Sequence, residues 1–127
     1  MADIQTQEDI YKVVSSFYTK LFSDERISYL FTTVIPIHLH LEAHLQVLVK
    51  FWSQALLGTG GYFNNLTQVH LDVNAKAALT KEHFEIWLNH LFEAIDEYYE
   101  GENCERMKNQ AYNLSAIMQI KIAQGKS

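Results

Sequence analysis

The chain has 127 residues, of which 48% are hydrophobic, 13% aromatic and 20% charged, and its net charge is −5. The apolar and aromatic content excludes a disordered chain, and the acidic balance argues against a nucleic-acid-binding module, which normally carries a basic surface. One proline and five glycines provide few turns, so we expect a single all-α domain over residues 1–127.

Apolar residues at helical spacing dominate the first half of the chain. They predict a helix over about residues 6–22, followed by a short helix for which Asp24 is the candidate cap. Pro36 interrupts the pattern, because the residue before a proline is pushed away from helical geometry. A second long helix is predicted over about residues 39–57, with Gly58 at its end.

The middle of the chain has a different composition. Residues 58–80 contain several Asn and Gly residues and only a short apolar interval, which predicts a loop. A loop of this length in a compact domain is uncommon and usually functional. Beyond it, Thr80 is the predicted N-cap of a helix over about residues 81–99, and Asn103 that of a last helix over about residues 104–123.

A lone cysteine, Cys104, excludes a disulfide scaffold and fits a reducing compartment. Its place near a helix start is compatible with a lowered pKa, but a half-buried structural cysteine is the favoured interpretation. The first residues lack the features of a signal peptide, and no apolar run is long enough to span a membrane. We therefore expect a cytoplasmic protein that does not associate with membranes.

The six histidines are the residues with the clearest ligand potential. His40 and His44 are one helical turn apart, a spacing that can bind zinc. The zinc-protease motif requires a glutamate directly after the first histidine, and this chain has Leu41 there. Two surface histidines are therefore the favoured interpretation of this pair.

A second arrangement of histidines is more specific. His44 lies on a predicted helix and His70 in the predicted loop, and an aromatic-rich apolar stretch runs between them. Two histidines on separate elements that face one apolar slot are typical of haem proteins. The alternative is that the aromatic residues simply fill a core; they are Phe17, Phe31, Phe51, Trp52, Phe84 and Trp87.

Several motifs follow one another in a characteristic order. They are Phe17-Tyr18, Leu30-Phe31, His44 ahead of Phe51-Trp52, Leu57-Gly58-x-Gly60-x-Tyr62, His70-Leu71 and His83-Phe84-x-x-Trp87-Leu88. In this order and spacing the chain resembles the truncated haemoglobins, specifically group III, from about Ile10 to Met118. The resemblance implies a two-over-two helical sandwich around a b-type haem, and the lack of a Cys-x-x-Cys-His motif implies non-covalent attachment.

The resemblance also implies roles for individual residues. His70 corresponds to the proximal ligand of the haem iron. Tyr18, His44 and Trp87 correspond to the polar residues on the distal side, where bound gas is held. The haem-contacting residues would be Phe31, Leu48, Phe51, Trp52, Phe84 and Trp87. We expect the four remaining histidines at the surface.

By the same resemblance, the expected function is reversible binding of O2, CO and NO by a monomer. A haem-dependent nitric oxide dioxygenase or a peroxidase-like enzyme is the alternative, and turnover of either kind would need a separate reductase. Donation to the ligand, gating and coordination of iron all remain open for His44. Lys50 and Lys76 are the basic candidates for pairing with the haem propionates.

Overall fold

The computed structural model describes residues 1–34, 36–58 and 78–124, and within them every regular element is helical. Most of the predicted loop, including His70 and Lys76, lies outside the described residues. The elements in chain order are α1 (Gln7–Ser23), the π-helical turn η1 (Leu30–Val34), the 3-10 turn η2 (Ile37–His40), α2 (Leu41–Leu57), α4 (Lys81–Tyr98) and α5 (Glu102–Gln124). The predicted all-α fold is confirmed.

Local sequence signals account for most helix ends. Thr6 is the N-cap of α1 and Thr80 is the N-cap of α4. At each of them the threonine side chain accepts the backbone N–H of the residue three positions later. Such capping boxes satisfy backbone groups that the first turn of a helix leaves without partners. Gly58 ends α2 in the left-handed conformation, with φ at 72°, which glycine adopts at little cost.

The segment after α1 forms the predicted short helix as the π-helical turn η1. Asp24 follows the last residue of α1, and its carboxylate accepts the backbone N–H of Arg26 at 3.0 Å. Pro36 then separates η1 from η2, as its restricted backbone requires. Two short turns therefore connect the first two long helices.

The start of α5 differs from the prediction. The helix begins at Glu102, so Asn103 lies inside its first turn and does not cap it. The capping group is the Asp3 carboxylate, which accepts the N–H groups of Asn103 at 2.8 Å and Cys104 at 3.1 Å. A Cβ at Gly101 would lie 2.5 Å from Asp3 Cγ, so a glycine is needed for this close approach. The cap was missed because it comes from the other end of the chain.

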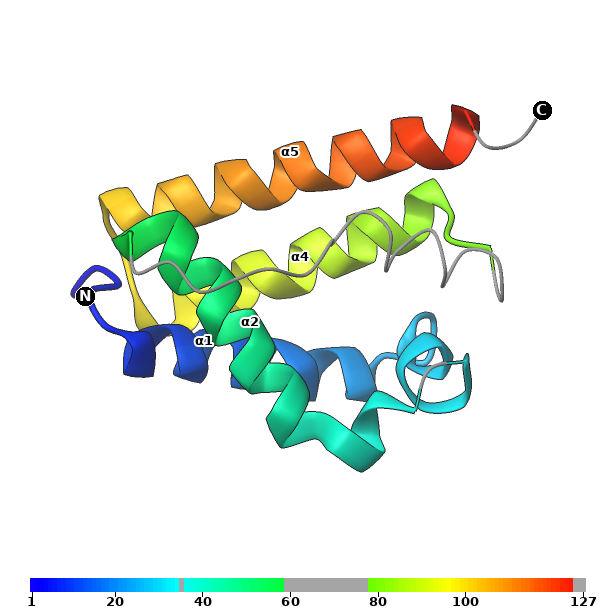
Figure 1. Cartoon of the computed structure of the whole chain (residues 1–127), viewed down its shortest axis with the longest axis horizontal. Coiled ribbons are helices and arrows are strands. Elements are labelled where there is room, and N and C mark those ends of the chain that lie inside the picture. The colour runs from blue at the N-terminus through cyan, green and yellow to red at the C-terminus, as the bar shows by residue number, and fades with distance from the viewer. Residues whose placement is uncertain (35, 59–77, 125–127) are drawn as a thin grey trace.

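The long helices form two pairs. Figure 1 shows α4 and α5 running antiparallel, with α1 alongside α4 and α2 crossing α1. The C-terminal end of α2 also packs against α5, so each pair contacts the other. None of the helices in the described ranges is long and apolar enough to cross a lipid bilayer.

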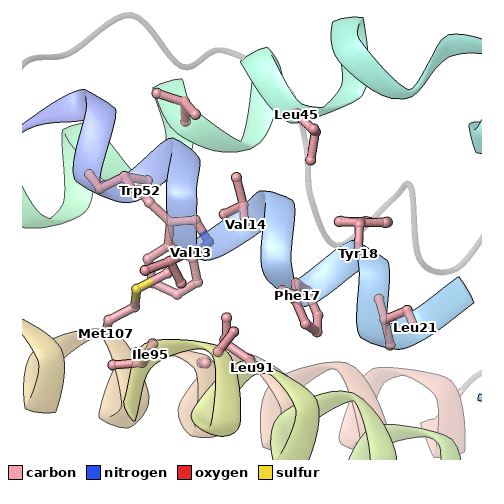
Figure 2. Packing of buried hydrophobic residues seen from close by; sticks show 14 of the residues in the cluster. Val13, Val14, Phe17, Tyr18, Leu21, Leu45, Trp52, Leu91, Ile95 and Met107 are labelled. Atoms are coloured by element: carbon pink, nitrogen blue, oxygen red, sulfur yellow. The ribbon is translucent and has the colours of Figure 1, made fainter. Parts of the chain in front are cut away.

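The core lies where the two pairs meet. Figure 2 shows Val13, Val14 and Phe17 of α1 between side chains of α2 on one side and side chains of α4 and α5 on the other. Burial of each large apolar side chain contributes about 1.5–3 kcal/mol to folding. The buried side chains that pack on α1 include Leu45 and Trp52 of α2, Leu91 and Ile95 of α4, and Met107 of α5.

The cap of α5 leads to a stability prediction. We expect Asp3→Ala to lower the free energy of unfolding by about 1–2 kcal/mol, because α5 loses the acceptor of its first N–H groups. Burial by itself raises the pKa of Asp3, but hydrogen bonds from Asn103 and its neighbours outweigh it and hold that pKa below 3.8. The carboxylate therefore stabilises the fold above its unfolded-state pKa, and this stability is lost as the pH falls through the folded-state pKa.

Urea unfolding at pH 7 and at several pH values below 4 measures the effect. The difference between wild type and Asp3→Ala should be largest at neutral pH and shrink in acid. Glu25→Ala, which removes an exposed carboxylate near the end of α1, is the control and should change stability little. An equal loss in both variants would exclude the capping role.

Candidate functional site

A cavity of about 250 Å³ lies between the two helix pairs. Its walls are mainly aromatic and aliphatic, with a few polar groups that face inward, which is typical of sites for small molecules and cofactors. His70 lies outside the described residues. All the other residues predicted to contact the haem or to lie on its distal side line the cavity, namely Tyr18, Phe31, His44, Leu48, Phe51, Trp52, Phe84 and Trp87.

Helical periodicity explains how these residues reach one space. His44, Leu48 and Phe51 are spaced along one face of α2, and Phe84 and Trp87 share a face of α4. Because α1 packs against both helices, its inward face closes the space between them. Three helix faces, each visible in the sequence as a stripe, therefore form much of the cavity wall, and side chains from the connection between α1 and α2 together with side chains of α5 add to it.

The most buried polar contact of the cavity joins α1 to α2. The Tyr18 hydroxyl lies 2.6 Å from Nε2 of His44, and the two rings meet edge to face. Tyr18 is only 5% exposed, and this burial raises the pKa of its hydroxyl above the ordinary value of 10.0. The hydroxyl is therefore protonated throughout the neutral range and can always donate a hydrogen bond.

Two further aromatic contacts set the shape of the cavity. The Phe31 ring packs edge to face on Tyr18, with ring centroids 5.6 Å apart. Trp87 packs on Phe17 in the same way at 5.8 Å. Within the described part of the chain no side chain or carbonyl accepts a hydrogen bond from the Trp87 indole, so its N–H remains a donor at the cavity wall.

A sequence profile described as that of the bacterial-like globins matches residues 2–120. The chain belongs to this family. The globin is 32% identical over 104 residues to the group 3 truncated haemoglobin ctb of Campylobacter jejuni, in an alignment that covers 81% of this chain and 76% of that protein. The crystal structure of the group III truncated haemoglobin from Campylobacter jejuni is similar to the globin with a TM-score of 0.85 and 27% identity, covering 96% of this chain and 95% of the other.

These similarities confirm the predicted family, group III of the truncated haemoglobins, and its truncated globin fold. Membership of the globin family implies haem binding, and the cavity is the candidate site for that group. Its apolar aromatic walls fit the faces of a porphyrin, and the Tyr18–His44 pair and Trp87 bring polar hydrogen atoms into an otherwise apolar space. The residues present therefore fit the group that the family implies.

The histidines expected at the surface behave in two ways. His38 and His40 are exposed on the globin, as expected. His83 and His90 are half-buried and hydrogen-bonded, so their expected exposure is wrong. His83 lines the cavity, and its position three residues after the Thr80 cap was the available signal.

The other ligand chemistries considered from the sequence are not supported. In the described ranges no group of three or more His, Cys, Asp or Glu side chains is placed to hold a metal ion. Cys104 is 1% exposed, and burial raises the pKa of its thiol to about 11. Such a thiol is inert at neutral pH, which agrees with a structural role.

A charged groove lies at the end of α1, outside the cavity that Tyr18 and His44 line. Its volume is about 520 Å³, and Lys20, Asp24, Arg26, His90 and Glu93 lie along it. Hydrogen bonds from Arg26 and then from His90, at 2.7 Å each, lower the pKa of Asp24. The groove carries ion pairs that join α1 to α4.

Proposed function

We propose that this globin binds one non-covalent haem b in the cavity, with His70 as the proximal ligand, and reversibly binds O2, CO and NO. The observation that carries the proposal is the pairing of buried Tyr18 with His44 inside an apolar cavity, beside the Trp87 indole. Support for His70 comes from its match to the family motif in the sequence. The cavity walls would contact the porphyrin through Phe31, Leu48, Phe51, Trp52, Phe84 and Trp87.

A haem iron supplies an open coordination position for a diatomic gas and shifts negative charge onto it. Tyr18 is suited to stabilise that charge, because its buried hydroxyl is protonated and needs no rearrangement of water to donate. The Trp87 N–H is a second donor on the same cavity. The His44 ring holds the Tyr18 hydroxyl in place at 2.6 Å, so the hydroxyl is already positioned at the cavity when a gas arrives.

Haem uptake tests the proposal. We expect the apoprotein to take up one haem per chain, with a Soret band, and the pyridine haemochrome spectrum to be that of haem b. Leu48→Arg places a charge in the apolar cavity and should weaken haem binding at least tenfold, since each ~1.4 kcal/mol of unfavourable burial is a factor of about ten.

The matched control for haem uptake is Leu39→Arg. Leu39 is 66% exposed, so the same substitution there should leave haem binding unchanged. Far-UV circular dichroism shows whether each variant remains helical. A wild-type chain that takes up no haem would disprove the proposed function.

The second candidate is an enzyme, either a nitric oxide dioxygenase or a peroxidase-like protein, that is supplied with electrons by a separate reductase. It is favoured by one observation, the imidazole of His44 at the cavity beside a protonated hydroxyl, which can move a proton during turnover. Sustained conversion of NO to nitrate, or of peroxide to water, in the presence of a cellular reductant would support it. Simple reversible gas binding without turnover would exclude it.

A further inference from the structure

His83 has a fixed place at the start of α4. The ring Nδ1 of His83 accepts the backbone N–H of Thr80 at 3.1 Å, and the backbone N–H of His83 donates to the Thr80 hydroxyl at 3.2 Å. The ring lines the cavity and is half-buried. The capping box therefore holds the imidazole at the boundary between the cavity and the surface.

The cap also determines which nitrogen of the neutral His83 ring carries the proton. Because Nδ1 accepts a hydrogen bond, it carries no proton, and the neutral ring must carry its proton on Nε2. Nε2 lies 3.0 Å from the Tyr29 hydroxyl, so His83 donates to the Tyr29 oxygen. The Tyr29 proton is then directed toward another acceptor, and none of the described residues supplies one. Accepting a bond from His83 makes the hydroxyl a better donor.

Tyr29 lies beside His83, one of the residues that line the cavity. It is 40% exposed, and its ring packs edge to face on His83, with the centroids 5.8 Å apart. Figure 1 shows the start of α4 at the same end of the molecule as η1, the turn that follows Tyr29. The two residues thus form a polar edge, here called the Tyr29–His83 edge, beside an apolar cavity.

The chemistry of haem matches this arrangement. The porphyrin is apolar except for two propionates on one edge, and a carboxylate without partners in an apolar interior is strongly unfavourable. The propionates must therefore lie where donors and water meet. The two basic side chains nearest in sequence to this edge already pair with acids, Arg26 with Asp24 and Lys81 with Glu85. Lys50, a candidate from the sequence, is exposed on α2 and does not line the cavity.

We propose that Tyr29 is a haem-binding residue whose hydroxyl, held by His83, donates a hydrogen bond to one haem propionate. The proposal rests on the proposed haem function and adds a contact to it. Tyr29 contacts the cofactor directly, and His83 is a positioning residue that acts through it. Because the Tyr29 hydroxyl is a donor, the Tyr29–His83 edge favours a ligand that carries a carboxylate.

Haem loss from two porphyrins tests the contact. The holoprotein is formed with haem b or with iron protoporphyrin IX dimethyl ester, whose propionates are esterified, and transfer to excess apomyoglobin is followed at the Soret band. Tyr29→Phe should speed the loss of haem b about three- to tenfold, the range for a partly exposed hydrogen bond to a charged acceptor. The ester keeps a carbonyl acceptor but carries no charge, so Tyr29→Phe should speed its loss clearly less than it speeds the loss of haem b.

A variant of His83 tests the positioning role. His83→Asn keeps a neutral acceptor for the Thr80 N–H but is too short to reach Tyr29. It should speed haem loss by less than Tyr29→Phe, and the double variant should be no faster than Tyr29→Phe alone, because both changes remove one contact. Tyr112→Phe, which removes a hydroxyl that is well exposed on α5, is the control and should have no effect.

Each remaining outcome is decisive. If Tyr29→Phe sped the loss of haem b and of its ester equally, Tyr29 would act by packing. If Tyr29→Phe left the rate for haem b unchanged, Tyr29 would make no contact with the haem. Either result overturns the proposal while leaving haem binding intact. A wild-type chain that retains neither porphyrin would overturn the proposed function and this contact together.

Discussion

Replacing His70 by alanine is expected to abolish tight haem binding. Loss of a hydrogen bond that merely orients a metal ligand weakens binding about 10–100-fold, so loss of the ligand itself should exceed about a hundredfold. The other histidines of the cavity already have partners, because His44 bonds to Tyr18 and both ring nitrogens of His83 are engaged. No substitute ligand is therefore ready among the described residues. Titration of the apoprotein with haem measures the loss.

The controls separate ligation from a general change of the protein. His38→Ala and His40→Ala remove exposed histidines and should bind haem as wild type does. His70→Gly leaves space for free imidazole, whose addition should restore a histidine-like ferrous spectrum. If His70→Ala kept the haem affinity and the ferrous spectrum of the wild type, another residue would be the proximal ligand.

Replacing Tyr18 by phenylalanine is expected to speed oxygen release by about ten- to a hundredfold. A hydrogen bond to a charged acceptor contributes about 1.5–3 kcal/mol, and each ~1.4 kcal/mol is a factor of about ten in the dissociation constant. Burial raises the pKa of Tyr18, so its hydroxyl donates at every pH at which the fold is stable, and the effect should be the same from pH 6 to pH 9. Stopped-flow displacement of oxygen by excess CO measures the rate.

The matched control is another tyrosine of α1. Tyr11 donates to Glu42 at 2.7 Å, and it does not line the cavity. Tyr11→Phe should therefore leave oxygen release unchanged. An unchanged rate in Tyr18→Phe would remove the hydroxyl from gas binding and leave the Trp87 indole and His44 as the candidate donors.

Local patterns were sufficient to predict the long helices. Apolar spacing together with the caps Thr80 and Gly58 predicts their bounds to within a few residues, because both signals act within one or two turns of backbone. The start of α5 was wrong for the opposite reason. Its capping carboxylate belongs to Asp3, a residue near the beginning of the chain, and no local pattern points to that contact.

The site was predictable in its members and not in its contacts. The stripes of α1, α2 and α4 carry all the predicted wall residues that the structure describes except Phe31, which lies in η1, so amphipathic spacing already places most of them on inward faces. The bond between Tyr18 and His44 depends on how α1 crosses α2, and the pattern of either helix leaves that crossing open. His83 was expected at the surface, whereas its contact with Tyr29 joins residues that are 54 positions apart in the chain.

Composition and periodicity were enough to establish an all-α chain and an apolar interior rich in aromatic residues, while the order of the motifs carried the resemblance to the group III truncated haemoglobins. These features depend on side-chain type and on spacing along one helix, which the order of residues specifies directly. The packing of the two helix pairs added the rest: the cap from Asp3, the Tyr18–His44 pair and the Tyr29–His83 edge. Each joins segments far apart in the chain, so its geometry exists only once hydrophobic burial has brought the helices together.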